Sequence, residues 1–157
     1  ENGLTISKTI YRPDGQILRS GLSKTYVNEK FIVLLEGEST HDSLNAMQTM
    51  IKDAIPAGFQ IESILTNSIR EVKYQWLPEL TGADVMEAND DAFFAASLSK
   101  SGRYSGSSYR TEFILAYELR ATTPGNYLST QAVIEDMYES AVMGSTSGSP
   151  SKVIANK

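Results

Sequence analysis

A Pro-Ala-Gly triplet at residues 56–58 constrains the fold more than any other feature of this sequence. Pro56 lacks a backbone donor and has a fixed φ, so a paired strand must end or bend there. Gly58 allows turn conformations that other residues avoid. Phe59 and Ile61 then resume an apolar alternation that is typical of a half-buried strand. The segment therefore predicts a corner between two strands.

A second corner, Pro124-Gly125, again separates two predicted strands. The strand before it, residues 109–122, has the clearest alternation in the chain, because Phe113, Leu115 and Tyr117 share one side. We expect Gly58 and Gly125 to adopt positive φ or to allow a close approach of chains, and the two prolines to fix the corners. Pro56, Gly58, Pro124 and Gly125 are therefore predicted to be structural positions.

The rest of the chain predicts more short strands and little helix. Residues 44–55 are ambiguous, because their apolar residues have helical spacing but the segment ends at Pro56; we interpret it as a strand. One helical turn is predicted around 74–77. The Gly/Ser-rich stretch 144–151 predicts a flexible segment before a possible last edge strand at 152–155. Further strands are predicted at 4–12, 31–38, 61–65, 84–88 and 92–98. The fold class is mainly β, an antiparallel β-sandwich with an immunoglobulin-like layer architecture.

Length and composition predict a single domain, residues 1–157, and exclude several functions. The net charge of −5 disfavours nucleic acid and anionic lipid as partners. The absence of cysteine excludes disulfides, thiolate metal sites and a cysteine nucleophile. No apolar stretch is long enough to span a membrane. Because the sequence starts at Glu1, we expect a monomeric C-terminal piece of a larger protein whose targeting signal lies elsewhere.

Candidate chemical groups are sparse, and each has a simpler structural interpretation. A catalytic dyad at His41-Asp42 would need a nucleophile beside it, and a solvated histidine in the polar loop 39–43 is favoured instead. The acids near residue 90 lack the spacing of a calcium loop. We therefore expect no catalytic residue, no cofactor and no metal site. Glu36 and Glu38 could act as a general acid and base, but charges that protect a strand edge are the simpler interpretation. Glu87, Asp90 and Asp91 are interpreted as a charged turn, and the glycine-rich residues 102–106 as a hairpin tip. Trp76 could be a binding anchor or a packing residue.

The pair Met137-Tyr138 lies between acidic residues and precedes the Gly/Ser-rich stretch. If the segment from Gln131 were helical, Val133, Ile134 and Met137 would form an apolar stripe, which would indicate core packing. Methionine is adaptable and tyrosine joins an apolar ring to a polar tip, so the pair also suits a contact that forms and breaks. Composition leaves both interpretations open.

Several segments, in this order, resemble the last macroglobulin-like domain of bacterial α2-macroglobulins. Residues 52–62 are similar to the family's corner of aspartate, Leu-Pro-Ala-Gly and glutamate. Residues 117–125 are similar to its Tyr-x-x-Arg-Ala-x-x-Pro-Gly element, and residues 135–138 to its Glu-x-Met-Tyr element. The opening 11–15 is also similar. Residues 89–93 are similar to its Arg-Asp-Asp-Arg strand entry, but Asn89 and Ala92 replace both arginines.

The resemblance implies a non-catalytic domain of a large periplasmic protease trap, a lipoprotein of the inner membrane. In this family a protease cuts a bait region, and an internal thioester is then exposed and captures the protease. The thioester belongs to a Cys-Leu-Glu-Gln segment, which this chain lacks. The implied partners are therefore the thioester domain and other neighbouring domains of the parent, and target proteases through the parent. The implied role of Met137 and Tyr138 is to shield the thioester from water.

Two other functions are compatible with the sequence. The first is a β-sandwich module of a surface adhesin or structural protein, which would be accompanied by tandem sandwich repeats or a surface anchor. The second is a carboxylate-dependent hydrolase, which would show activity in the isolated chain.

Overall fold

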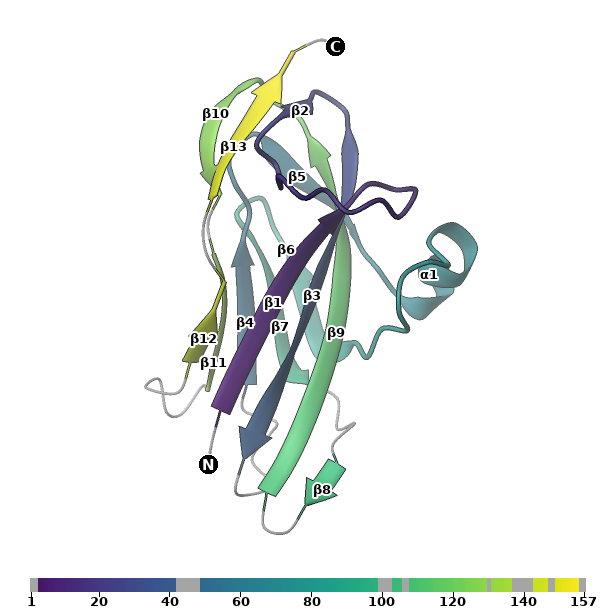
Figure 1. The fold of residues 1–157 in the computed structure, drawn as a ribbon, viewed down its shortest axis with the longest axis vertical. Helices are drawn as coiled ribbons and strands as arrows, with labels where there is room; N and C mark the ends of the chain where they lie inside the picture. The colour runs from purple at the N-terminus through teal and green to yellow at the C-terminus, as the bar shows by residue number, and fades with distance from the viewer. Residues whose placement is uncertain are drawn as a thin grey trace.

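The computed structural model describes residues 3–41, 49–98, 103–105, 108–129, 131–136, 143–146 and 149–155. In these ranges the fold is a β-sandwich with one short helix (Figure 1). The strands are β1 (Gly3–Tyr11), β2 (Thr25–Tyr26), β3 (Lys30–His41), β4 (Thr49–Ala54), β5 (Phe59–Ile64), β6 (Ala83–Ala88), β7 (Ala92–Leu98), β8 (Arg103–Ser105), β9 (Ser108–Ala121), β10 (Gly125–Ser129), β11 (Ala132–Asp136), β12 (Met143–Ser145) and β13 (Ser149–Ile154), and the helix is α1 (Asn67–Lys73).

The first sheet has the antiparallel order β1-β3-β9-β5, with β8 paired to one end of β9. Its two central strands are buried on both faces. Phe31, Val33 and Leu35 face the main core, whereas Ile32 and Leu34 belong to a second apolar cluster on the outer face. Burial on both faces is the reason why residues 31–35 form a continuous apolar run rather than an alternating one.

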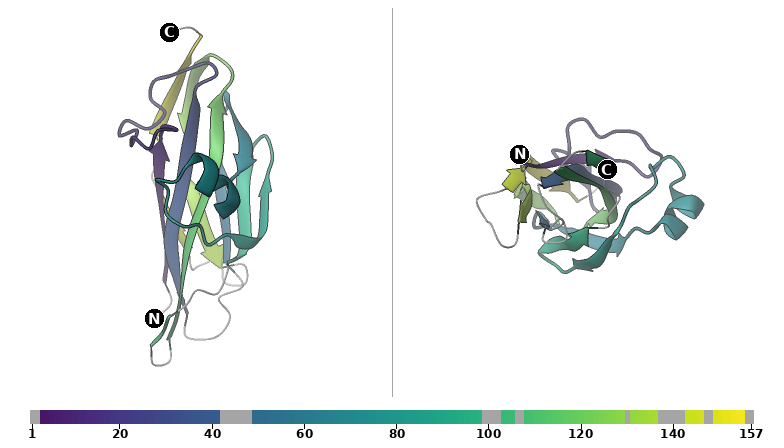
Figure 2. Two further views of the ribbon diagram at one scale, coloured as in Figure 1. Left: turned by 90° about the vertical axis from the view of Figure 1, so that its right-hand side faces the viewer. Right: turned by 90° about the horizontal axis from the view of Figure 1, so that it is seen from below.

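The second sheet has the order β12-β11-β4-β7-β6 and packs face to face with the first (Figure 2). Its inward side chains, including Ile51, Phe93, Ala95 and Ile134, are fully buried and join the main core. These two sheets confirm the predicted antiparallel β-sandwich. Within the segment 44–55, which was interpreted as a strand, residues 49–54 are a strand, as predicted. Residues 44–48 lie outside the described residues.

The third sheet, β10-β13-β2, includes residues 149–154, which the sequence assigned partly to a flexible segment at 144–151 and partly to a possible edge strand at 152–155. Residues 143–145 are β12, which pairs with β11, and residues 149–154 are β13. β13 pairs with β10 on one side and with β2 on the other, so it is a central strand and not the predicted edge strand. The glycine and serine content favoured a linker, but backbone hydrogen bonding depends little on those side chains.

The helix and one loop also differ from the prediction. α1 begins seven residues before the predicted turn at 74–77, with Thr66 as its N-cap and Tyr74 as its C-cap. Sequence periodicity did not reveal it, because none of its residues is fully buried. Residues 39–41 continue β3 rather than forming a polar loop, and they pair with β9. With seven residues, α1 is too short to span a bilayer, and the described ranges contain no other α-helix.

Candidate interaction site

The predicted shielding pair, Met137 and Tyr138, lies outside the described residues. The chain on either side is described: β11 ends at Asp136 and β12 begins at Met143, and the two strands pair antiparallel. Because residues 132–136 are a strand, Val133 and Ile134 lie on opposite faces of the sheet. Ile134 is buried and Val133 is partly exposed, so the helical stripe considered from the sequence is wrong for this part.

The two predicted corners lie side by side, although more than sixty residues separate them in the sequence. The carbonyl oxygen of Gly58 accepts hydrogen bonds from the backbone nitrogens of Thr122 and Thr123, at 2.7 and 3.2 Å. It also accepts one from the Thr122 hydroxyl at 3.1 Å. Pro56 is buried, whereas Pro124 is exposed. The corner between β4 and β5 is thereby fixed against the end of β9.

Tyr127 packs between the two corner glycines. Gly58 has a φ of 87°, and a Cβ on it would overlap the Tyr127 ring. A Cβ on Gly125 would lie 2.7 Å from the Tyr127 hydroxyl oxygen. That hydroxyl donates to the carbonyl oxygens of Thr123 and Pro124, at 3.0 and 3.1 Å. Both glycines therefore leave room for the same ring, that of Tyr127. At Gly58 the positive φ is a second reason for glycine.

A buried polar cluster joins the two large sheets. The Lys8 ammonium group on β1 donates to one oxygen of Asp53 on β4 at 2.9 Å. The Tyr117 hydroxyl on β9 donates to the other oxygen at 2.5 Å. Asp53 and Tyr117 are fully buried, and Phe93 stacks on the Tyr117 ring with centroids 5.2 Å apart. Burial, and then the Asp53 charge, raise the pKa of Tyr117 well above its usual value, so it stays a neutral donor.

A second buried carboxylate, that of Glu118 on β9, lies next to Tyr74 at the C-terminal end of α1. Glu118 is 4% exposed and accepts a hydrogen bond from the Tyr74 hydroxyl at 3.1 Å. Desolvation, with the nearby Glu118 charge and this hydrogen bond, raises the pKa of Tyr74 to about 12. Trp76 lies beside it, with its indole nitrogen donating to the Pro13 carbonyl. Trp76 therefore packs against the opening turn of the chain.

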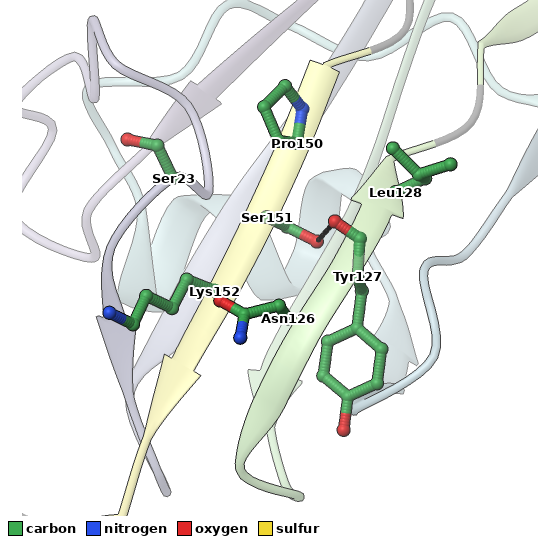
Figure 3. A pocket seen from close by; sticks show the side chains of 7 residues that line it. All are labelled: Ser23, Asn126, Tyr127, Leu128, Pro150, Ser151 and Lys152. Carbon is green, nitrogen blue, oxygen red and sulfur yellow. Dashed lines mark hydrogen bonds between the residues drawn. The ribbon is translucent and has the colours of Figure 1, made fainter.

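An open hollow of about 400 Å³ lies on β10, β13 and the loop before β2 (Figure 3). Most of its lining surface is apolar, and Leu128 within it is 80% exposed. It contains no arrangement of acid, base and nucleophile. Its lining residues are Ser23, Asn126, Tyr127, Leu128, Pro150, Ser151 and Lys152.

The other candidate groups do not assemble into a chemical site in the described part of the chain. His41 is the last residue of β3, and Asp42 lies outside the described residues. β3 is a central strand, so Glu36 and Glu38 do not protect an edge. Glu87, Asp90 and Asp91 are all exposed. The described residues contain no group of three or more histidine, cysteine, aspartate or glutamate side chains that could hold a metal ion. Of the glycine-rich residues 102–106, only 103–105 are described, as β8.

Sequence reasoning did not identify Lys8 and Tyr127 as structural partners. Asp53 and Tyr117 both lie in segments that resemble the family's motifs, 52–62 and 117–125. Their contact joins two different sheets, so it cannot be predicted from the spacing of residues in the sequence. The one available signal for Lys8 was its position among apolar residues of an alternating strand.

A family model described as the bacterial alpha-2-macroglobulin MG10 domain matches residues 3–140. The chain is also similar to a crystal structure of Salmonella alpha-2-macroglobulin reacted with methylamine, at 25% identity and a TM-score of 0.68. The matched region covers 98% of this chain and 9% of the Salmonella chain. No significant match was found among curated proteins.

Two Escherichia coli structures share the fold. The native conformation of alpha-2-macroglobulin has a TM-score of 0.74 at 22% identity, over 98% of this chain and 10% of that one. A native fragment from domain MG7 to the C-terminus has a TM-score of 0.70 at 21% identity, over 98% of this chain and 24% of that one. The chain therefore spans a small part of the proteins it matches.

Proposed function

The chain belongs to the bacterial alpha-2-macroglobulin MG10 domain family, and from this membership we propose that it is a non-catalytic domain of a bacterial protease trap. Its specific task in this proposal is to shield the parent's thioester, with Met137 and Tyr138 as the covering side chains. The observation that carries the proposal is the family match over residues 3–140, which includes the Glu-x-Met-Tyr element at 135–138.

The local structure supports a covering role for this segment. β11 pairs with β4 on one side and with β12 on the other, so the Glu-x-Met-Tyr element begins at the end of a strand that is paired on both sides. A thioester is attacked by water and amines, so its storage requires a dry apolar cover. The cover must also be released, which favours a connection between strands over a core position.

The rest of the proposal concerns the parent protein. The partners are the thioester domain and other neighbouring domains of the same chain, and target proteases through the parent. The location is the periplasm, with the parent anchored in the inner membrane. The chain itself is expected to be a single domain over 1–157, a monomer in isolation, without hydrolytic activity.

The shielding role is tested in the parent with the double variant Met137→Ala, Tyr138→Gly. We expect the variant to react several-fold faster with methylamine before any bait cleavage, because water and amines reach the thioester more easily. Release of free thiol measures the reaction. Val72→Ala is the matched control, since Val72 on α1 is 81% exposed. Equal rates in the double variant and the unaltered parent would exclude the shielding role.

The alternative, in which both side chains are part of this domain's own core, predicts a different result. The double variant would then lose roughly 2–5 kcal/mol of unfolding free energy for the methionine alone. A shield would change the stability of the isolated domain very little. Chemical denaturation of the isolated variant separates these cases.

A further inference from the structure

The third sheet has one strand with an open edge. β13 is paired on both sides, with β10 and with β2, whereas β10 is paired with β13 alone among the described residues (Figure 1). The outer edge of β10 therefore carries backbone groups that the described part of the fold does not use. Such an edge is a template for the addition of another strand.

The direction of the free backbone groups of β10 follows from its partner, β13. The N–H of Lys152 donates to the Leu22 carbonyl oxygen in the loop before β2, at 2.9 Å. The carbonyl oxygen of Lys152 accepts from the Thr25 hydroxyl on β2, also at 2.9 Å. Lys152 and Asn126 therefore form a non-hydrogen-bonded pair, and the N–H and C=O of Asn126 point away from β13. The period of two residues gives Leu128 the same orientation, so the open edge offers two donors and two acceptors.

The edge of β10 also lacks the features that normally protect a strand edge, which are charges, bulges, short length or a covering segment. The other edge strands of the described residues have them. β6 carries the exposed acids Asp84 and Glu87, and β5 carries Glu62 and a shift of register after Ile61. β1 lies against β11 and β12, and the strands β2, β8 and β12 have only two or three residues each. β10 has five residues, none of them charged or proline, and its pairing with β13 is regular.

The solvent face of β10 borders the open hollow of about 400 Å³ (Figure 3). Asn126 and Leu128 are exposed on this face, beside their cross-strand partners Lys152 and Pro150. Leu128 is 80% exposed. A strand added to β10 would place alternate side chains on this face, and the one opposite Leu128 would cover that leucine. The hollow therefore favours an apolar side chain at this position of the added strand.

The surroundings of the edge are basic, although the chain has a net charge of −5. The third sheet and the loop before β2, which comprise residues 19–26, 125–129 and 149–154, contain no acidic residue. They contain Arg19, Lys24 and Lys152, and all three are exposed. Glu29, the first acid after β2, already forms an ion pair with Arg12 at 3.3 Å. Charge complementarity therefore selects an acidic partner for this edge.

We propose that the open edge of β10 binds an extended acidic segment of another protein as an added strand. Backbone hydrogen bonds to Asn126 and Leu128 hold the segment, and one apolar side chain packs on Leu128 and Pro150. An acidic side chain two residues away lies on the same face, towards Lys152. The five-residue edge buries a small area, so the binding is transient. This inference goes beyond the proposed thioester shield and does not depend on it.

A synthetic peptide tests the edge in the chain of 157 residues. The probe is the capped peptide Thr-Glu-Thr-Leu-Thr-Glu-Thr, which reads the same in both directions and has its leucine and glutamates on one face of a strand. We expect solvent exchange of the Asn126 and Leu128 amides, measured by NMR, to slow several-fold at saturating peptide. The Tyr127 amide faces β13, so its exchange should not change. Unchanged exchange of Asn126 and Leu128 would overturn the proposal.

A second peptide of the same composition controls for the strand period. In Thr-Thr-Glu-Leu-Glu-Thr-Thr the glutamates lie on the face opposite the leucine. We expect this peptide to need a several-fold higher concentration for the same effect. Equal potency of the two peptides would show that the contact does not have the alternation of a strand, which would overturn the proposal.

Variants of the chain separate backbone pairing from side-chain contact and charge. Leu128→Pro removes an outward N–H without breaking a bond to β13, and it should abolish the slower exchange at Asn126. Leu128→Ala keeps that N–H and should weaken binding only several-fold. Lys152→Glu should weaken binding of the glutamate peptide several-fold and strengthen binding of the same peptide with lysines instead. Lys73→Glu, at an exposed position on α1, is the matched control and should bind like the unaltered chain.

Thermal melting of each variant checks that it is folded. If a folded Leu128→Pro variant bound the peptide like the unaltered chain, strand addition would be wrong. If Leu128→Pro does not fold, the Lys152→Glu variant decides, because unchanged preference between the glutamate and lysine peptides would exclude an acidic partner.

Two other occupants of the edge give different results without any peptide. If exchange at Asn126 and Leu128 slowed as the concentration of the chain rose, a second copy would be the partner, and the proposal would be overturned. If these amides exchanged more slowly in the longer parent protein than in the chain alone, a segment of the parent would cover the edge, which also overturns it. Equal exchange in both, with slowing on addition of the glutamate peptide, supports a separate acidic partner.

Discussion

At the scale of single residues, the space taken by one aromatic ring requires glycine at the two corners as much as backbone conformation does. Gly58 has a positive φ and also faces the Tyr127 ring, whereas Gly82 has a φ of 68° with no atom within 4 Å of a Cβ. Gly58→Ala should therefore cost more unfolding free energy than Gly82→Ala. Strain at positive φ is worth about 1–3 kcal/mol, and the contact with Tyr127 adds to it. Chemical denaturation measures both.

A double variant separates the two causes at Gly58. In a Tyr127→Ala background the ring is absent, so the further loss caused by Gly58→Ala should fall towards that of Gly82→Ala. It should stay somewhat larger, because the Thr123 carbonyl oxygen still lies 3.0 Å from a Cβ at Gly58. An unchanged loss in that background would show that the Tyr127 ring is not a reason for the glycine at position 58.

The Tyr74–Glu118 pair predicts a loss of stability in alkali. Because the pKa of Tyr74 is raised to about 12 in the folded state from 10.0, the unfolded chain loses this proton first as the pH rises. The folded state then binds more protons, so stability falls with increasing pH between about 10 and 12. Tyr74→Phe should flatten this fall, although it leaves Glu118 without its donor. Unfolding free energies at several pH values would detect the difference, with Val72→Ala, which removes no titratable group from an exposed position on α1, as the control.

At the scale of elements, the sequence identified strands that have a clear side-chain pattern and missed those that do not. Alternation located the strands at 3–11 and 108–121 almost to the residue. The strand at 92–98 was predicted from side chains that are mixed on both faces, and the expectation that both of its faces are covered is wrong, because Phe94 and Ala96 are partly exposed. The Gly/Ser-rich residues of β12 and β13 gave no such signal. Their order comes from backbone pairing with β10, β11 and β2, which depends on the whole fold. For the same reason α1, without a buried stripe, was misplaced.

Val153 distinguishes a central strand from a flexible tail. It is 3% exposed on β13 and belongs to the main core. Val153→Ala should lower the unfolding free energy by about 1–3 kcal/mol, since buried methyl groups are lost. Leu128→Ala on the paired strand β10 is the control; Leu128 is 80% exposed, so its change should stay within about 0.5 kcal/mol. If both variants behaved alike, β13 would not be packed as described.

At the scale of the whole molecule, the sequence predicted a sandwich but not what joins its layers. The motif residues Asp53 and Tyr117 are 64 positions apart, and only the packed sheets bring them together with Lys8. The shield residues were predicted through family resemblance and stay a prediction.

The Lys8–Asp53–Tyr117 cluster gives a stability prediction for the joined layers. Lys8→Met removes one partner and leaves the fully buried Asp53 carboxylate with Tyr117 alone. Breaking a buried pair in this way costs about 3–5 kcal/mol, because the remaining charge has no compensation.

Replacing all three groups by apolar residues of similar size, as Lys8→Met, Asp53→Leu and Tyr117→Phe, removes that charge. The triple variant should therefore recover most of the loss, as buried ion pairs replaced by apolar groups often do. Denaturant unfolding compares the two, with Lys24→Met at an exposed position as the control. A triple variant no more stable than Lys8→Met would show that the cluster stabilises the sandwich through its specific geometry and not merely through charge balance.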